Sequence, residues 1–154
     1  MRCSRFVVLL AAFCLFGISE PRRVVGAEWD DYTPSKELWN ITQVKVQPSK
    51  IDDYLLGLRK SWVLAMEIGK KNGTVSAYRI LVNRTPVADG PNIILLTEYV
   101  DWTSANPDQM RDMATRDEFR KSLSEEQEKT LSQEFDKYRS YVGEGDFWAV
   151  QYKK

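Results

Sequence analysis

The charged residues best placed for chemistry in this sequence are Arg79 and Glu98. They lie in two strand-like segments, VSAYRILVN from Val75 and NIILLTEYV from Asn92, which we expect to pair as a hairpin. A carboxylate near a guanidinium could hold or polarise a small substrate, and the neighbouring Tyr99 could take part in a proton transfer. The structural alternative is an ordinary ion pair between neighbouring strands.

Large aromatic side chains form a second candidate site. The set consists of Trp62, Tyr78, Tyr99, Trp102 and Trp148. Such rings could line a pocket for a planar, apolar ligand. Because large aromatic residues also fill cores and subunit contacts, the sequence leaves both interpretations open.

The residue types that are missing exclude several kinds of chemistry. The sequence contains no histidine, and its two cysteines, Cys3 and Cys14, both lie in the N-terminal leader. Histidine-based nucleophile pairs, histidine-ligated haem and nearly all zinc sites are therefore excluded. Acidic residues cluster where helices are predicted to begin, and there a favourable interaction with the helix dipole explains them better than metal binding does. The sequence also contains no nucleotide-binding fingerprint. We expect no metal and no cofactor.

Length and charge indicate a single acidic domain. The 154 residues carry 22 basic and 22 acidic side chains, and four basic residues and one acidic residue belong to the leader. The remainder therefore has a net charge near −3. Its lysines and arginines are scattered and form no stripe that would attract phosphate groups, so we expect no nucleic-acid partner.

Residues 1–27 have the pattern of a cleavable secretory signal. Arginines precede an apolar run over 6–18 that is too short to span a bilayer. Cleavage after Ala27 fits best, and a cut after Ser19 is the second choice. An uncleaved membrane anchor is the alternative. We expect a periplasmic or secreted protein that has no membrane contact once the signal is removed. Three glycosylation sequons, at Asn40, Asn72 and Asn83, matter only if the source is a eukaryote.

The rest of the sequence predicts a linker over 28–37 and one domain over 38–154. Period-2 alternation predicts strands, and apolar spacing of three and four predicts helices. In chain order the expected elements are a strand at 38–47, a helix at 49–72, strands at 75–83 and 92–100, a broken helical region from 106, a helix at 124–142 and a strand at 146–154. Ser49 with Asp52, and Ser124 with Gln127, resemble helix-capping pairs, and Gly73 is placed to stop the first helix.

This order is that of a ferredoxin-like α+β fold, β-α-β-β-α-β. It implies a four-stranded antiparallel sheet with helices on one face. The strands at 92–100 and 146–154 are apolar on both faces, whereas two helical segments can cover only one face. We therefore expect the second face to pack against that of an identical subunit in a homodimer.

Four segments resemble the dimeric α+β barrel superfamily, whose members include cofactor-free monooxygenases similar to those of antibiotic biosynthesis. They are ITQVKVQPSKIDDYLLGLRKSW, AYRILVN, IILLTEYVDW and DFWAVQY, and together they span most of 38–154. The resemblance implies the barrel-forming dimer. It does not select an activity, because the superfamily also contains isomerases, haem-degrading enzymes and exported proteins of unknown role. The absence of histidine sets this sequence apart from the haem-degrading branch, whose iron ligand is typically histidine.

Two functions remain. The first is an exported, dimeric module that binds a small apolar or aromatic molecule or has another non-catalytic role. The alternative is a cofactor-free monooxygenase or isomerase for an aromatic or polyketide-like substrate, in which Glu98 or Tyr99 moves a proton and Trp102 stacks on the ring. That enzyme would require Glu98 to point into a closed cavity.

Overall fold

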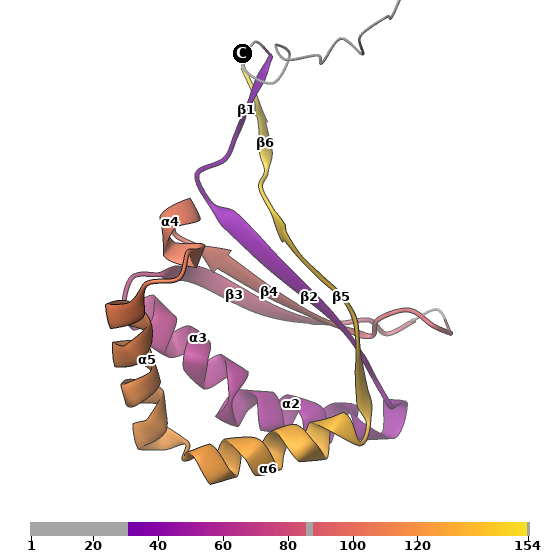
Figure 1. Cartoon of the computed structure of the whole chain (residues 1–154). Helices are drawn as coiled ribbons and strands as arrows, with labels where there is room; N and C mark the ends of the chain where they lie inside the picture. Colours follow the sequence, from indigo (N-terminus) through magenta and orange to yellow (C-terminus); the bar gives the residue numbers. More distant parts are fainter. Residues whose placement is uncertain (1–30, 86–87, 154) are drawn as a thin grey trace, which may run out of the picture.

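A four-stranded antiparallel sheet with helices packed on one face forms the body of the chain, as Figure 1 shows for the computed structural model. The structure describes residues 31–85 and 88–153; the expected signal at 1–27 lies outside them. In chain order the elements are β1 (Tyr32–Pro34), β2 (Leu38–Val46), η1 (Pro48–Lys50), α2 (Ile51–Lys60), α3 (Trp62–Lys71), β3 (Val75–Val82), β4 (Ile93–Tyr99), α4 (Trp102–Ala105), α5 (Gln109–Ser122), α6 (Glu125–Asp136), β5 (Arg139–Phe147) and β6 (Val150–Tyr152).

The strand order confirms the predicted fold class. The sheet is arranged β3-β4-β2-β5, and its three neighbouring pairs are antiparallel. The first and third of these strands along the chain therefore lie in the centre, and the helices of the two crossovers lie on one face, as in ferredoxin-like folds. The hairpin predicted between the second and third strands is present as β3 and β4.

The first helical segment is broken, whereas the sequence predicted one helix over 49–72. Ser61 separates α2 from α3, with φ −119° and ψ −83°. Its hydroxyl donates to the carbonyl of Gly57 at 3.1 Å, and its amide donates to Leu58 at 3.2 Å. A serine side chain that competes for a helical carbonyl commonly bends a helix, which explains the break. The cap expected from Ser49 is also wrong, because the segment opens with a 3₁₀ turn. Gly73 ends α3 with φ +72°, as predicted.

The last helix is shorter than the predicted 124–142. It begins with the predicted capping box, in which Ser124 and Gln127 each bond the other's backbone, but it ends at Asp136. Residues from Arg139 onward pair with β2 as the edge strand β5. The apolar spacing of this region was compatible with a helix, but pairing with β2 outweighs that local preference. A register shift between Gln43 and Val44 adjusts the pairing.

A second, two-stranded sheet joins the two ends of the described chain. β1 lies within the segment expected to be a linker, and it pairs with β6. The predicted terminal strand at 146–154 is divided, since Phe147 ends β5 and β6 begins at Val150. Figure 1 shows this β1–β6 ribbon projecting away from the helices as a continuation of β2 and β5.

The core lies between one end of the sheet and the helices α2 and α6. It consists of Val44, Val46, Tyr54, Leu58, Ile93, Leu95 and Phe135. The rings of Tyr54 and Phe135 pack edge to face at 4.7 Å between centroids. The buried side chain of Asn92 accepts a hydrogen bond from the amide of Val46 at 2.8 Å and donates to its carbonyl at 2.7 Å, which satisfies a strand end inside the core.

We predict that Gly57→Ala destabilises the protein. A β-carbon at position 57 would lie 2.4 Å from the ring of Phe135 and 3.1 Å from Leu131. Overpacking of this kind costs about 1–3 kcal/mol, which exceeds the gain of about 1 kcal/mol in helix propensity. Urea denaturation should show a net loss. The control is Gly143→Ala, where nothing lies within 4 Å; a variant at position 57 as stable as wild type would contradict the close packing of α2 and α6.

Candidate functional site

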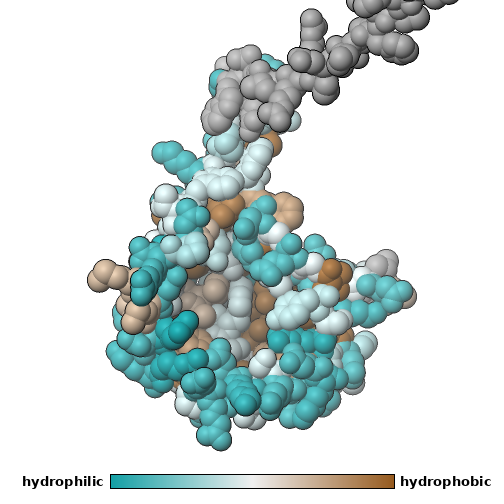
Figure 2. Space-filling view, viewed as in Figure 1, coloured by the Kyte–Doolittle hydropathy of each residue, from teal (hydrophilic) through white to brown (hydrophobic). Residues whose placement is uncertain are grey.

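A cavity of about 500 Å³ opens between the helices and the face of the sheet that they cover. Its lining comes from β2, β4 and β5 on one side and from α2, α3, α5 and α6 on the other. Figure 2 shows the hollow, with pale and brown residues inside and hydrophilic residues around it. The cavity continues the core, because Tyr54, Leu58, Leu95 and Phe135 belong to both.

Aromatic and apolar side chains form much of the wall. Trp62 points inward from α3, and its ring lies 5.4 Å from that of Tyr78 in an edge-to-face contact. Tyr78 donates to Glu67 at 2.6 Å, and this hydrogen bond raises the pKa of Tyr78. Met66 lies beside Thr97, whose hydroxyl donates to the sulfur at 3.3 Å. The wall thus offers flat, apolar surfaces of the kind that small organic ligands contact.

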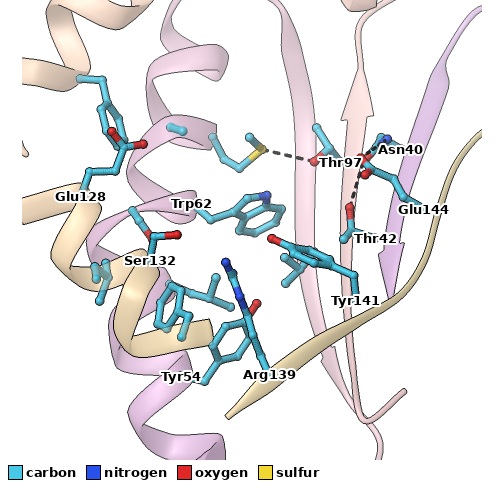
Figure 3. A pocket seen from close by; sticks show the side chains of 18 of the residues that line it. Asn40, Thr42, Tyr54, Trp62, Thr97, Glu128, Ser132, Arg139, Tyr141 and Glu144 are labelled. Atoms are coloured by element: carbon cyan, nitrogen blue, oxygen red, sulfur yellow. Dashed lines mark hydrogen bonds between the residues drawn. The ribbon is translucent and has the colours of Figure 1, made fainter. Parts of the chain in front are cut away.

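Arg139 points into this cavity from the first residue of β5 (Figure 3). Its side chain is 12% exposed, and its guanidinium lies 4.9 Å from the ring centroids of both Phe135 and Tyr141. Nη2 donates to Asp136 at 3.3 Å, and the phenol of Tyr54 is a further polar neighbour of the guanidinium. The buried Nε has no hydrogen-bond partner among the described residues. A largely buried cation with incomplete pairing therefore faces the cavity.

The polar groups farther along β5, Glu144 and Asp146, are hydrogen-bonded to Asn40 of β2. Asn40 donates to Glu144 at 3.3 Å and to Asp146 at 2.9 Å, and it accepts from Thr42 at 3.3 Å. The bonds to Glu144 and Asp146 cross from β2 to β5, whereas the bond from Thr42 lies within β2. Figure 3 shows Asn40, Thr42 and Glu144 at the other end of the cavity from Arg139. The carboxylates at this end of the cavity therefore already accept a hydrogen bond from the protein.

Glu128 is the other carboxylate in the lining, and it is paired. An oxygen of Glu128 lies 2.6 Å from Nη1 of Arg120, so α6 and α5 are joined at the rim. The ion pair leaves this wall without a net charge.

Two tyrosines of the lining have raised pKa values. Burial raises the pKa of Tyr54, against a smaller opposite effect of Arg139. Burial also raises the pKa of Tyr99, and Asp146 and Glu144 add to the effect. Both phenols are therefore neutral at physiological pH, and each can donate a hydrogen bond.

The structure brings together only part of the predicted site. Trp62 and Tyr99 line the cavity, and Tyr78 supports Trp62 from behind. Trp102 begins α4 and donates to the carbonyl of Ser35 at 3.4 Å, and Trp148 lies between β5 and β6. Neither of these two tryptophans is part of the lining.

Arg79 and Glu98 lie on the opposite face of the sheet. Arg79 pairs with Leu96 and Glu98 with Ala77, whereas the core and cavity residues on β4 are Ile93, Leu95, Thr97 and Tyr99. Because successive side chains alternate, Glu98 points away from the cavity that Tyr99 lines. Among the described residues neither Arg79 nor Glu98 forms an ion pair. The expected cross-strand pair is therefore not made.

Sequence reasoning missed Arg139, Tyr141, Glu144 and Asn40. The first two were placed in or near a predicted helix, which concealed that they share one face of a strand. The order Arg139, Ser140, Tyr141 would have suggested an alternating strand if the helix had been ended at Asp136.

No cluster of three or more histidine, cysteine, aspartate or glutamate side chains that could hold a metal occurs within 31–85 and 88–153. In the same part of the chain, no helix has the length and apolar character needed to cross a membrane.

Among known proteins, this chain shows similarity to solved structures but not to family models or curated proteins. No family model matches the chain, and no curated protein matches it significantly. A dimeric protein of unknown function and ferredoxin-like fold from Bacteroides fragilis is 15% identical, with a TM-score of 0.41, over 76% of this chain and 100% of that one. A dimeric ferredoxin-like protein from an uncultured marine organism is 12% identical, with a TM-score of 0.42, over 77% and 89%. HapK from Hahella chejuensis is 9% identical, with a TM-score of 0.43, over 71% and 90%.

The raised pKa of Tyr54 predicts a specific dependence of stability on pH. A folded-state pKa above the unfolded value of about 10 stabilises the fold below that pH, and the contribution is lost as pH rises through the folded pKa. Tyr54→Phe removes both this titrating group and its polar interaction with Arg139, which costs about 0.5–1.5 kcal/mol at neutral pH. Denaturation at a series of pH values should show the two stability curves converging above about pH 10. Curves that stay parallel would contradict this role of Tyr54.

Proposed function

We propose that this chain is a dimeric module that binds a small, planar, largely apolar molecule in the cavity between its sheet and its helices. The cavity of about 500 Å³ is the observation that carries the proposal. Ligand sites are typically clefts of about 300–1,000 Å³ with apolar walls and a few convergent polar groups. The signal-like leader supports placing this module outside the cytoplasm.

The lining favours a flat ligand. Trp62, Tyr141 and Phe119 contribute rings from three different elements, and aromatic surfaces attract planar groups through offset or edge-to-face contacts. Arg139, Tyr99 and the group around Asn40 are the polar features that would orient a bound molecule. A core packed without a ligand would instead fill such a volume with its own side chains.

The face of the sheet away from the helices supports assembly as a homodimer. Register places Trp39 beside Glu98 and Phe147, and Ile41 beside Leu96. The apolar side chains of this outer face are Trp39, Ile41, Leu81, Ile94, Leu96 and Phe147. Leu81 is 47% exposed and Phe147 is 50% exposed, and a sheet face with several exposed apolar side chains is unusual on a monomer.

Charge on this outer face favours a second copy of the chain as the occupant. Arg79 and Glu98 have opposite charges and lie on neighbouring strands without an ion pair to another described residue. A twofold contact brings the same patch of both subunits together, so it requires a surface that complements itself. Arg79 of one copy could then meet Glu98 of the other.

No observation favours the alternative, a cofactor-free monooxygenase or isomerase. Glu98, its proposed proton acceptor, lies on the outer face of the sheet, and Trp102 is not part of the cavity lining. A general base must lie within hydrogen-bond reach of the proton that it removes. Tyr99 has the right position, but its raised pKa keeps it protonated.

Filling the cavity should abolish ligand binding. Ala65 lines the cavity from α3, and Ala65→Phe would place a ring inside it. The probe is 2-naphthamide, a neutral planar compound. It should raise the unfolding midpoint of the wild type, because a ligand at 100 times its Kd stabilises a protein by about 2.7 kcal/mol. It should have no effect on the variant. Ala114→Phe makes the same change at an exposed position on α5 and should bind like wild type. No shift in the wild type, or an equal shift in the Ala65 variant, would contradict the proposed site.

A charge on the outer face should break the dimer. Leu81→Glu or Phe147→Glu would bury carboxylates against apolar surface, which is costly without a partner charge. Light scattering should report a dimer for the wild type and a monomer or aggregate for either variant. The control is Leu56→Glu, since Leu56 is 61% exposed on α2 on the helical side of the molecule. A wild-type monomer at micromolar concentration would overturn the dimer.

A further inference from the structure

We infer that the ligand carries a carboxylate on its planar body, and that Arg139 binds this carboxylate. The inference rests on the proposed function, since it names the ligand class of the same cavity. It begins from the pairing of the charged groups that line the cavity, because a buried charge is stable only when it is adequately paired.

Arg139 is the cation of the lining, and its pairing is incomplete. The nearest carboxylate belongs to Asp136, whose side chain is 66% exposed and accepts from Nη2 at the long distance of 3.3 Å. The remaining neighbours are the rings of Phe135 and Tyr141 and the phenol of Tyr54. These groups contribute no full negative charge, and Nε has no partner among the described residues.

One carboxylate of the lining, Glu128, forms an ion pair, and the other, Glu144, is hydrogen-bonded to a neutral amide at the other end of the cavity. Glu128 lies 2.6 Å from Arg120, and Glu144 accepts from Asn40. A cationic ligand would have to compete with these donors for the carboxylates, and the pairing of Arg139 would stay incomplete. An anionic ligand would complete the pairing of the one cation in the lining. The unpartnered Nε of Arg139 therefore favours an anion at the Arg139 end, whereas the charge of Glu144 disfavours an anion at the other end.

The surroundings of Arg139 select a carboxylate on a flat body. A guanidinium binds a carboxylate through parallel hydrogen bonds in one plane. The ring of Tyr141 lies beside the guanidinium, and Trp62 points into the same cavity (Figure 3), so an aromatic acid could contact these rings while its carboxylate meets Arg139. A single arginine suits one negative charge better than the two of a phosphate monoester.

The test compares 2-naphthoate with 2-naphthamide, which have the same ring system and differ in charge. Calorimetric titration of wild-type protein at neutral pH should give a Kd for the naphthoate that is about tenfold to a hundredfold lower, as expected for one buried charge-assisted contact. Arg139→Gln should remove this difference and leave the affinity for naphthamide nearly unchanged. Arg139→Lys should retain part of it. Arg59→Gln, at an exposed position on α2, is the control and should behave as wild type.

The outcomes separate this inference from the proposed function. Equal binding of the two compounds by wild type would overturn the carboxylate assignment and leave the cavity as a binding site. Failure of both compounds to bind would overturn the proposed function, and this inference with it. A preference for naphthoate that survives in Arg139→Gln would place the anion elsewhere. If Arg139→Gln does not fold, the wild-type ratio and the Arg139→Lys variant still decide the matter.

Discussion

The contact between Phe135 of α6 and the helix α2 determines where the helical layer touches the sheet. The ring lies against Tyr54 and over the bare backbone of Gly57, so α2 and α6 approach closely at this point. Val44, Val46 and Ile93 complete the dense packing beneath them. Farther along, the helices and the sheet separate, and the same walls that form the core enclose a cavity. The site is therefore a consequence of packing the fold tightly at one end.

The alternation of side chains along each strand divides the molecule into two functional faces. Tyr99 lines the cavity, while its neighbour Glu98 belongs to the outer face. The same rule separates Leu95 from Leu96 and Ile80 from Leu81. Ligand binding and self-association can therefore be changed independently, because they depend on alternate residues of the same strands.

Local patterns in the sequence were enough for the fold but not for the site. Gly73, the Ser124 and Gln127 pair and the alternation of the strands predicted at 38–47, 75–83 and 92–100 act over a few residues, and the structure contains these features close to their predicted positions. The break at Ser61 and the end of α6 at Asp136 depend instead on competing hydrogen bonds and on pairing with β2. Trp62 and Tyr99 could be identified by residue type, whereas Arg139 acquires its position through long-range pairing.

The ribbon formed by β1 and β6 makes the stability of the cavity wall depend on the two ends of the described chain. The amide of Lys153 donates to Asp31 at 2.9 Å, and β6 is exposed along its whole length. Along the chain β6 follows β5, which carries Arg139, Tyr141 and Glu144 and, among the described strands of its sheet, pairs with β2 alone. Fraying that begins at the ribbon would thus break the hydrogen bonds between β5 and β2 one after another. The ribbon holds this end of β5 in place. A pulling force on the two ends would therefore separate one wall of the cavity before it disturbed the packing around Phe135.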